Sequence, residues 1–238
     1  MKKLGIGLTA VLAMVLGMAV TALAQPNGLY LAPKIGYSHL KGKFTETFYG
    51  DEGVETENYN GSKGQLVLGL AVGYDFKPVF DVPLRTELEY AWRGKKELYS
   101  FFEEDLGAFP GNNGFGKIKV GAQSFFVNAF FDIYNPSPVT PYIGAGLGFA
   151  RLASEFQFND NEGIYSFGTS KSGTNFAWNI GAGAAWKVAE NVALDLGYRY
   201  VDFGNVTSSS PIGPDDEYIT LKTKASTHEV LLGLRYTF

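Results

Sequence analysis

The chain has no cysteine and only two histidines. Without cysteine, disulfide bonds and thiolate metal sites are excluded throughout its 238 residues. Beyond the first 24 residues, no apolar run approaches the length of about 20 residues that a membrane-spanning helix needs. If the mature chain enters a membrane, it must therefore do so as a closed β-barrel, because closure pairs every backbone group between strands.

Positive charge is also scarce, with 20 lysines and arginines against 24 aspartates and glutamates and a formal net charge of −4. Two of those lysines, Lys2 and Lys3, lie in an N-terminal segment that we expect to be removed, which takes the net charge from −4 to −6. So acidic a chain lacks the basic surface that holds a phosphate backbone. We therefore expect no nucleic-acid partner.

The N-terminus is typical of a secretory signal. Lys2 and Lys3 precede an apolar run over 4–20, and the small residues Ala22 and Ala24 have the spacing of a cleavage site. A membrane anchor is the alternative, but its apolar run is marginal in length. We expect a cleaved signal peptide at 1–24, followed by a single mature domain at 25–238.

What the mature chain does contain is alternation of apolar and polar residues, in eight segments. They lie at 28–40, 65–76, 84–93, 119–134, 141–152, 175–187, 192–203 and 225–238. Successive side chains of a strand point to opposite faces, so alternation at this period predicts strands with one apolar face.

The connections between these segments alternate strictly between long and short. The long ones cover 41–64, 94–118, 153–174 and 204–224, and the short ones cover 77–83, 136–140 and 188–191. Short periplasmic turns and long external loops are the outer-membrane pattern. The sequence predicts an all-β fold, an eight-stranded antiparallel up-and-down transmembrane β-barrel with four long external loops and both termini periplasmic.

The two faces of each segment favour lipid outside the barrel. In 65–76, Leu68 and Leu70 oppose Gly69 and Gly73, and in the other clean segments glycines also share the face that carries charges. A soluble barrel would turn its large apolar residues inward, and alternation alone does not exclude it. Glycine suits a crowded interior better than a solvated wall, which favours an interior that holds both the glycines and the charges.

Aromatic residues make up 15% of the chain, and several lie near the ends of the apolar face. Trp178 and Trp186 share a face, and their spacing along a strand tilted by about 40° corresponds to roughly 20 Å of height. This approximates an apolar band of about 25 Å bounded by aromatic girdles. The interface aromatics predicted in this way are Tyr74, Trp92, Trp178, Trp186 and Tyr198.

The predicted interior carries six cations and six anions. They are Lys34, Arg85, Arg93, Lys187, Arg199 and Arg235, with Asp75, Glu87, Glu89, Asp132, Asp195 and Glu229. Buried charges are costly unless they are paired, so the balance predicts a salt-bridge network that fills the lumen of a narrow barrel. The alternative for the same residues is a gated path for ions or protons.

Three runs carry a family resemblance, PYIGAGLGFA at 141–150, LDLGYRYVDFG at 194–204 and LRYTF at 234–238. With them the mature chain resembles the opacity-type family of small outer-membrane β-barrels. The resemblance implies a monomeric eight-stranded barrel of a Gram-negative bacterium, delivered by periplasmic chaperones to the barrel-assembly machinery. It also implies that Tyr236 and Phe238 belong to the C-terminal signal which that machinery recognises. Members serve as surface antigens, adhesins, host-factor binders or envelope-stabilising proteins.

The two histidines raise the question of an enzyme. His39 follows Ser38, His228 precedes Glu229, and the first and last strands pair when a barrel closes, so both histidines could lie close together. A base-activated serine needs such a grouping. However, adjacent strand residues point to opposite faces, which separates each histidine from its neighbour. We therefore expect no enzyme.

The predicted loops hold acidic clusters, among them Asp51 with Glu52, and exposed aromatics such as Phe44, Tyr59 and Tyr99. Carboxylates suit divalent cations, but no run has the spacing of a calcium loop, so we expect no metal and no cofactor. The aromatics either form a contact surface or pack against one another over the barrel mouth.

These observations together predict a non-enzymatic outer-membrane surface protein that gives envelope integrity and contacts ligands or other cells through its loops. Expected partners are outer-membrane lipids and lipopolysaccharide, the assembly machinery, and host or neighbouring-cell surface molecules. The alternative is a narrow porin-like conduit for ions or a small apolar solute.

Overall fold

The computed structural model describes residues 28–50, 53–103, 114–160, 166–211 and 218–238. They form eight strands and one short helix. The strands are β1 (Leu29–Gly50), β2 (Gly53–Asp75), β3 (Leu84–Glu103), β4 (Gly114–Asp132), β5 (Val139–Asp160), β6 (Ser166–Ala189), β7 (Val192–Pro211) and β8 (Tyr218–Thr237), and helix α2 (Lys77–Phe80) lies between β2 and β3. The predicted signal peptide at 1–24 lies outside the described residues.

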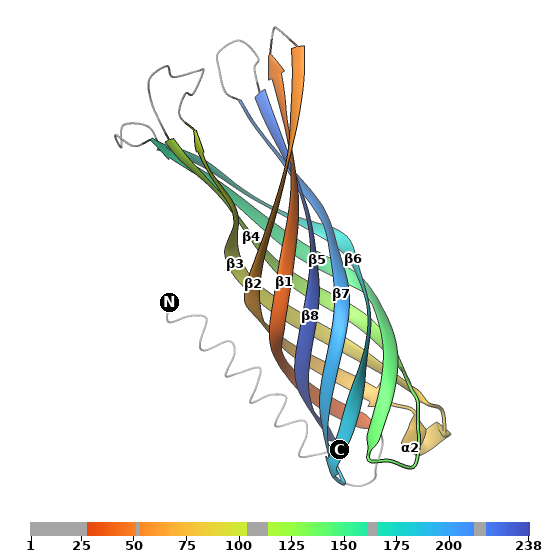
Figure 1. The fold of residues 1–238 in the computed structure, drawn as a ribbon. Coiled ribbons are helices and arrows are strands. Elements are labelled where there is room, and N and C mark those ends of the chain that lie inside the picture. The colour runs from red at the N-terminus through yellow and green to blue at the C-terminus, as the bar shows by residue number, and fades with distance from the viewer. Residues whose placement is uncertain (1–27, 51–52, 104–113, 161–165, 212–217) are drawn as a thin grey trace, which may run out of the picture.

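Each strand pairs with the next along the chain, and β8 pairs with β1 to close the barrel (Figure 1). Every pairing is antiparallel, and the closing ladder runs from Tyr30 opposite Thr237 to Tyr49 opposite Tyr218. The predicted eight-stranded antiparallel up-and-down barrel is confirmed. Among the described residues, no helix is both long enough and apolar enough to span a membrane.

The strands extend well beyond their predicted ends. Strand β1 continues to Gly50 and β2 begins at Gly53, so most of the long connection predicted at 41–64 is a paired hairpin. The other three predicted loops are likewise largely strand. Alternation does continue there, with Lys41 and Lys43 exposed and Gly42 and Phe44 buried, but charged residues replace the apolar outer face of the lower strands.

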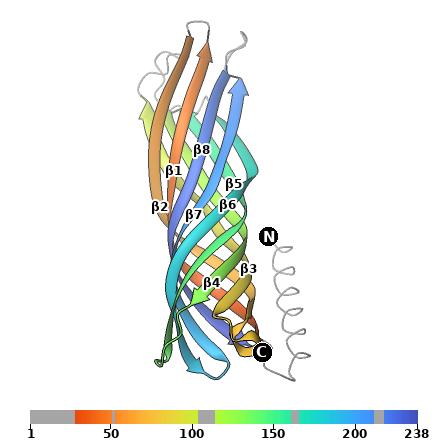
Figure 2. The same cartoon turned by 90° about the vertical axis from the view of Figure 1, so that its right-hand side faces the viewer.

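Two of the eight ladders stop part-way up the barrel. The β2–β3 ladder ends at Val67 opposite Arg93, and the β6–β7 ladder ends at Trp178 opposite Asp202. The other six continue toward the strand tips. Above this level the barrel therefore divides into two four-stranded sheets, β2-β1-β8-β7 and β3-β4-β5-β6, which diverge in Figures 1 and 2.

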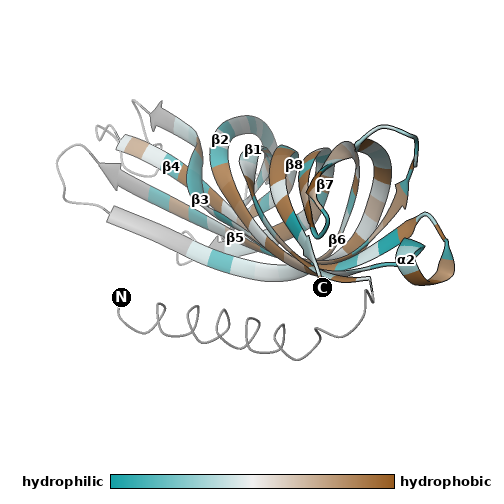
Figure 3. Ribbon diagram, turned by 90° about the horizontal axis from the view of Figure 1, so that it is seen from below, coloured by the Kyte–Doolittle hydropathy of each residue, from teal (hydrophilic) through white to brown (hydrophobic). Residues whose placement is uncertain are grey.

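The polarity of the two faces inverts near the same level. Toward the short turns, the outer face carries exposed apolar residues such as Leu68 and Leu232, and the interior is charged. Toward the strand tips, buried apolar residues such as Leu40 and Phe203 fill the interior, and the outer face is polar. Figure 3 shows the alternation of hydrophobic and hydrophilic residues along the strands, seen from the end where α2 and the C-terminus lie.

Candidate functional site

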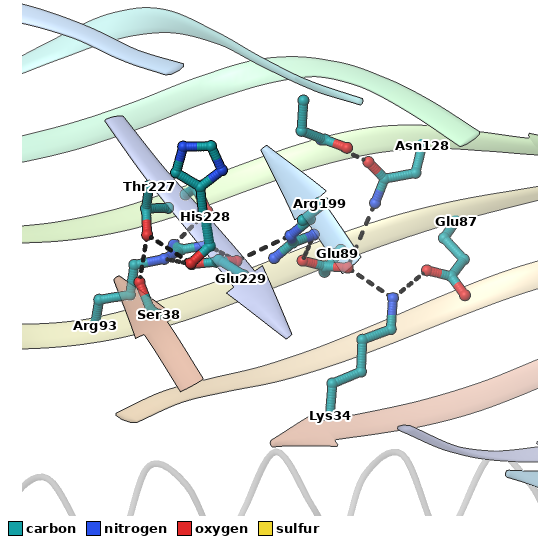
Figure 4. Close-up of polar contacts among 12 residues, drawn as sticks. Lys34, Ser38, Glu87, Glu89, Arg93, Asn128, Arg199, Thr227, His228 and Glu229 are labelled. Atoms are coloured by element: carbon teal, nitrogen blue, oxygen red, sulfur yellow. Dashed lines mark hydrogen bonds and ion pairs between the residues drawn. The ribbon is translucent and has the colours of Figure 1, made fainter. Parts of the chain in front are cut away.

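The lower lumen holds a continuous network of ion pairs, centred on Glu89 of β3 (Figure 4). Its carboxylate, fully buried, accepts hydrogen bonds from Lys34 Nζ of β1 at 2.7 Å and from Arg199 Nη1 of β7 at 2.7 Å. Lys34 Nζ also reaches Glu87 Oε2 at 2.5 Å. Four side chains from three strands that are distant in sequence are thus joined across the barrel.

Glu229 of β8 extends this network upward. Its carboxylate, fully buried, accepts two hydrogen bonds from Arg93, Nε at 2.5 Å and Nη2 at 2.9 Å, and a third from Arg199 Nε at 2.9 Å. Arg93 Nη1 donates to Ser124 Oγ at 3.0 Å. Bidentate arginine–carboxylate pairs of this kind combine charge with fixed geometry, which stabilises ions that have lost their water.

A second pair lies nearer the short turns. Arg85 donates from Nε and Nη2 to the two carboxylate oxygens of Asp132, at 2.7 and 2.9 Å. The guanidinium lies 5.0 Å from the ring centroids of both Phe130 and Tyr142. Cation–π contact and a bidentate partner together compensate the burial of this charge.

The remaining predicted lumen charges are less closely held. Arg235 Nε lies 3.7 Å from Asp195 Oδ2, and Asp75 accepts a hydrogen bond from the backbone N–H of Lys77 at 2.9 Å. Lys187, also predicted as a lumen charge, has an exposed side chain at the end of β6 and lies outside the buried network. The register of the β6–β7 ladder is irregular between Lys187 and Ala189, just before the short turn to β7.

Glycines leave the room that these polar side chains need. A side chain on Gly146 would overlap the Asn128 and Asn179 amides, which hydrogen-bond to each other at 2.9 Å beside Glu89. A cavity of about 50 Å³ remains, with Lys34 and Asp195 among its lining residues. This is space for a few water molecules.

An apolar layer closes the lumen above the ion pairs. It contains Leu40, Phe44, Leu98, Ile118, Val120, Ala122, Phe126, Ala150, Leu152, Ala177, Val201, Phe203, Val206 and Ala225. Tyr59 and Tyr99 pack against it, with ring centroids 5.1 Å apart. These aromatics and Phe44 therefore fill the space between the two sheets instead of forming an exposed contact surface. Sequence reasoning did not find this layer, because it assigned one polarity to the whole interior.

The predicted interface aromatics lie at several levels of the barrel, and their place at the membrane interfaces stays a prediction. Trp92, Trp178, Trp186 and Tyr198 are exposed on the outer face. Trp178 packs against Tyr200 at 5.5 Å, and Tyr200 against His228 at 5.3 Å, near the level where the outer face becomes polar. Tyr74 is half-buried and stacks edge-on with Phe76 at the opposite end.

The predicted C-terminal signal residues also lie at that opposite end. The rings of Tyr236 and Phe238 pack edge-on at 5.3 Å, and the Phe238 N–H donates to the carbonyl of Leu29 at 2.9 Å. The last residue is thus tied to the first described strand, where the barrel closes.

The serine, histidines and glutamate considered for hydrolysis do not form a catalytic group. His39 and His228 are register partners across β1 and β8, so the expected proximity is confirmed. His228 Nδ1 lies 2.7 Å from the Tyr198 hydroxyl on the outer face. Ser38 is buried on the other face and bonds to Thr227 at 2.7 Å, while Glu229 belongs to the ion-pair network. In the part of the chain that the structure describes, no three metal-ligating side chains gather either.

Two titratable groups beyond the apolar band have shifted pKa values. Burial, assisted by a hydrogen bond to Glu57, raises the pKa of the Tyr59 hydroxyl. A hydrogen bond from Lys95 at 2.9 Å lowers the pKa of Glu155. The Lys95–Glu155 pair links β3 to β5 across the outer part of one sheet.

Sequence comparison identifies the family. The family model of the outer membrane protein beta-barrel domain matches residues 8–238. The chain belongs to this family. The protein is accordingly an outer-membrane protein, with its short turns on the periplasmic side and its strand tips outside the cell.

Two curated proteins and one solved structure illustrate what the chain is similar to. Outer membrane protein PagN of Salmonella typhimurium is 32% identical over 239 residues, which cover 96% of this chain and 97% of PagN. A protein of Rickettsia conorii provisionally named an adhesin is 28% identical over 132 residues, 54% of this chain and 53% of that protein. The crystal structure of OprG from Pseudomonas aeruginosa has the same fold, with a TM-score of 0.52, 11% identity, and coverage of 90% of this chain and 99% of OprG.

Proposed function

We propose that this outer-membrane barrel is a non-enzymatic adhesin, which contacts other cells or their secreted molecules through the tips of its two outer sheets. One observation carries the proposal. Six of the eight strand ladders continue as paired sheets above the level where the outer face becomes polar, on a barrel whose interior is filled. Sheets of this kind present their tips rigidly, and tips on a rigid scaffold are where binding residues concentrate.

The filled interior favours a surface function over a conduit. Lys34, Arg93 and Arg199 each pair with buried carboxylates across the lower lumen, and the apolar layer lies directly above them. A hydrated ion that crossed this barrel would have to break the pairs and then enter a dry layer. Both steps are costly in a medium of low dielectric constant.

Similarity to named proteins supports the same assignment. One relative carries a provisional name as an adhesin, and PagN aligns with nearly the whole chain as an outer-membrane protein. We further propose that residues 1–24 are a cleaved signal peptide, and that the barrel is a monomer in the outer-membrane lipid. Chaperones and the assembly machinery would then act on its C-terminal aromatics, Tyr236 and Phe238.

The test removes the tips and keeps the scaffold. Each hairpin can be shortened by equal lengths on both strands if the deletion ends at a pair of cross-strand partners. Thr47 faces Thr56, and Ser209 faces Thr220. Residues 48–55 and 210–219 are replaced by two-residue Asn-Gly turns, which join antiparallel strands tightly. Residues 100–117 and 157–168 are replaced in the same way, since Tyr99 faces Ile118 and Phe156 faces Thr169.

Adhesion to an epithelial monolayer is compared between cells that express the intact and the trimmed barrel in equal amounts. We expect the trimmed barrel to fall to the level of the empty-vector strain, while its unboiled sample keeps the gel mobility of a folded barrel. Equal adhesion by both strains would contradict the proposal.

A further inference from the structure

An apolar groove lies on the lipid-facing side of the closing strands. It is lined by Ile35 and Tyr37 of β1, Leu66 of β2, Leu196 of β7, and Val230 and Leu232 of β8, with the Gly36 backbone also in the lining. The six side chains are apolar or aromatic, and all six are exposed to about half of their surface. In a membrane, a groove of this composition is occupied by a hydrocarbon chain, because water has no polar partner there.

The groove ends where charge begins. On β1, the outer face passes from Tyr37 through His39 to Lys41 and Lys43, and on β8 it passes from Val230 through His228 to Lys224 and Lys222. All four lysines are exposed. At a rise of about 3.3 Å per residue and a tilt of about 40°, Lys41 and Lys43 stand roughly 5 and 10 Å above His39.

These four lysines and two histidines form what we call the basic face. Among the described residues of the outer face at this level of β2, β1, β8 and β7, the single carboxylate is Asp202, 3.6 Å from Lys224 Nζ. Their other outer neighbours are neutral, such as Ser62, Asn60 and Asn205. Four lysines against one aspartate is a local excess of positive charge on a chain whose net charge is −4.

The lysines are not placed to stabilise the isolated sheet. Lys43 faces Lys224 directly across β1 and β8. Like charges directly opposite each other destabilise a sheet. Anionic groups bound over these two lysines would replace the repulsion between them by attraction to the ligand. The arrangement therefore indicates a ligand that carries more than one negative charge.

We propose that the groove and the basic face together bind one acylated, phosphorylated glycolipid of the outer leaflet, the chemistry of lipopolysaccharide. One acyl chain lies in the groove, and the phosphates of the headgroup contact Lys41, Lys43 and Lys224. The apolar groove and the basic face adjoin on the same strands. The groove lies at the level of the acyl chains and the lysines lie at the level of the headgroup, which is the order of these parts in a membrane lipid. A soluble sulfated or phosphorylated glycan would use the lysines and leave the groove without a role.

The experiment uses the full barrel, refolded into phosphatidylcholine nanodiscs and titrated with purified lipopolysaccharide. The variant K43Q/K224Q removes the facing lysines, and L66W fills the groove from an exposed position. K96Q/K171Q is the matched control, because these two exposed lysines lie on β3 and β6 of the other sheet. Binding is measured as the rise in the unfolding temperature and as the half-saturating concentration.

We expect lipopolysaccharide to stabilise the wild-type barrel, and K43Q/K224Q to need at least tenfold more of it. L66W should also weaken this binding, and K96Q/K171Q should match the wild type. Without lipopolysaccharide, K43Q/K224Q should unfold at a higher temperature than the wild type, because its repulsion is gone. A variant that had merely lost structure would instead unfold at a lower temperature in both conditions.

Three results would overturn the proposal. The first is equal binding of lipopolysaccharide that has been dephosphorylated chemically. The second is binding of a soluble sulfated oligosaccharide as tightly as lipopolysaccharide with no effect of L66W, which would assign the basic face to a glycan. The third is equal binding by K43Q/K224Q and K96Q/K171Q. These outcomes are independent of the adhesion assay, because the trimmed barrel retains all four lysines.

Discussion

Replacement of Glu229 by glutamine tests whether the lumen network holds the barrel together. Glu229 is fully buried and accepts three hydrogen bonds from two arginines. Glutamine has nearly the same shape but no charge, so Arg93 loses its carboxylate and Arg199 keeps Glu89 alone. Removal of one partner from a buried ion pair costs about 3–5 kcal/mol, and we expect a loss of this size in the free energy of unfolding.

A second substitution separates the ion pair from simple packing. In E229Q/R93Q the lumen loses one charge of each sign, so no uncompensated arginine remains at this position. We expect the double variant to be about 2–3 kcal/mol more stable than the sum of the two single losses predicts, the size of coupling found for residues in one network. Glu190→Gln is the control, since Glu190 is exposed beside a short turn, and it should change stability by less than about 0.5 kcal/mol.

The measurement is equilibrium unfolding in urea of barrels inserted in lipid vesicles. The outward-facing Trp92, Trp178 and Trp186 report it by fluorescence, because their environment changes when the strands leave the lipid. A loss below about 1 kcal/mol for E229Q, or strict additivity in the double variant, would refute the claim that these charges act as one network.

Three further predictions follow from other parts of the molecule. Deletion of Phe238, which packs on Tyr236 at the closing strand, should lower the amount of barrel in the outer membrane without altering adhesion per inserted molecule, and normal amounts of truncated protein on a blot would contradict this. The wild-type barrel should show no stable conductance steps in planar bilayers, whereas F126S/F203S, which wets the apolar layer, should show brief openings; steady large steps from the wild type would contradict the filled lumen. Lys95 lowers the pKa of Glu155, so at pH values above the unfolded-state pKa of about 4.3 this pair stabilises the fold by less than about 1 kcal/mol. The difference in stability between the wild type and E155Q should vanish as the pH falls through the lowered pKa of Glu155 in the folded protein.

Much of the barrel could be predicted from the sequence, because alternation is strong wherever lipid faces one side of a strand. Leu68 and Leu70 opposite Gly69 illustrate this, and so does Glu89, whose burial follows from its place between Leu88 and Tyr90. Which cation pairs with Glu89 could not be predicted. Lys34 and Arg199 lie far from it in sequence, and their approach depends on the stagger of the closed barrel.

The outer half of the molecule was harder to predict. Above His39 the outer face becomes polar and the interior becomes apolar, so a hydrophobic pattern searched for with one orientation is lost at that level. Lys41 and Lys43 consequently looked like loop residues, although they alternate with the inward Gly42 and Phe44. A search that allowed the two faces to exchange polarity part-way along a strand could have found these strands. On β1 the outer face changes from the aromatic Tyr37 to the charged Lys41, and the inner face changes from the charged Lys34 to the apolar Leu40.

The division into two sheets has a consequence for the order of assembly. The sheet β3-β4-β5-β6 comes from one uninterrupted stretch of chain, so its hairpins can form locally. The sheet β2-β1-β8-β7 joins the first two strands to the last two, and its central ladder is the closing one. The basic face is therefore absent from any intermediate in which β1 and β8 are still apart. A molecule that presents it has completed folding, so glycolipid binding there would stabilise finished barrels selectively.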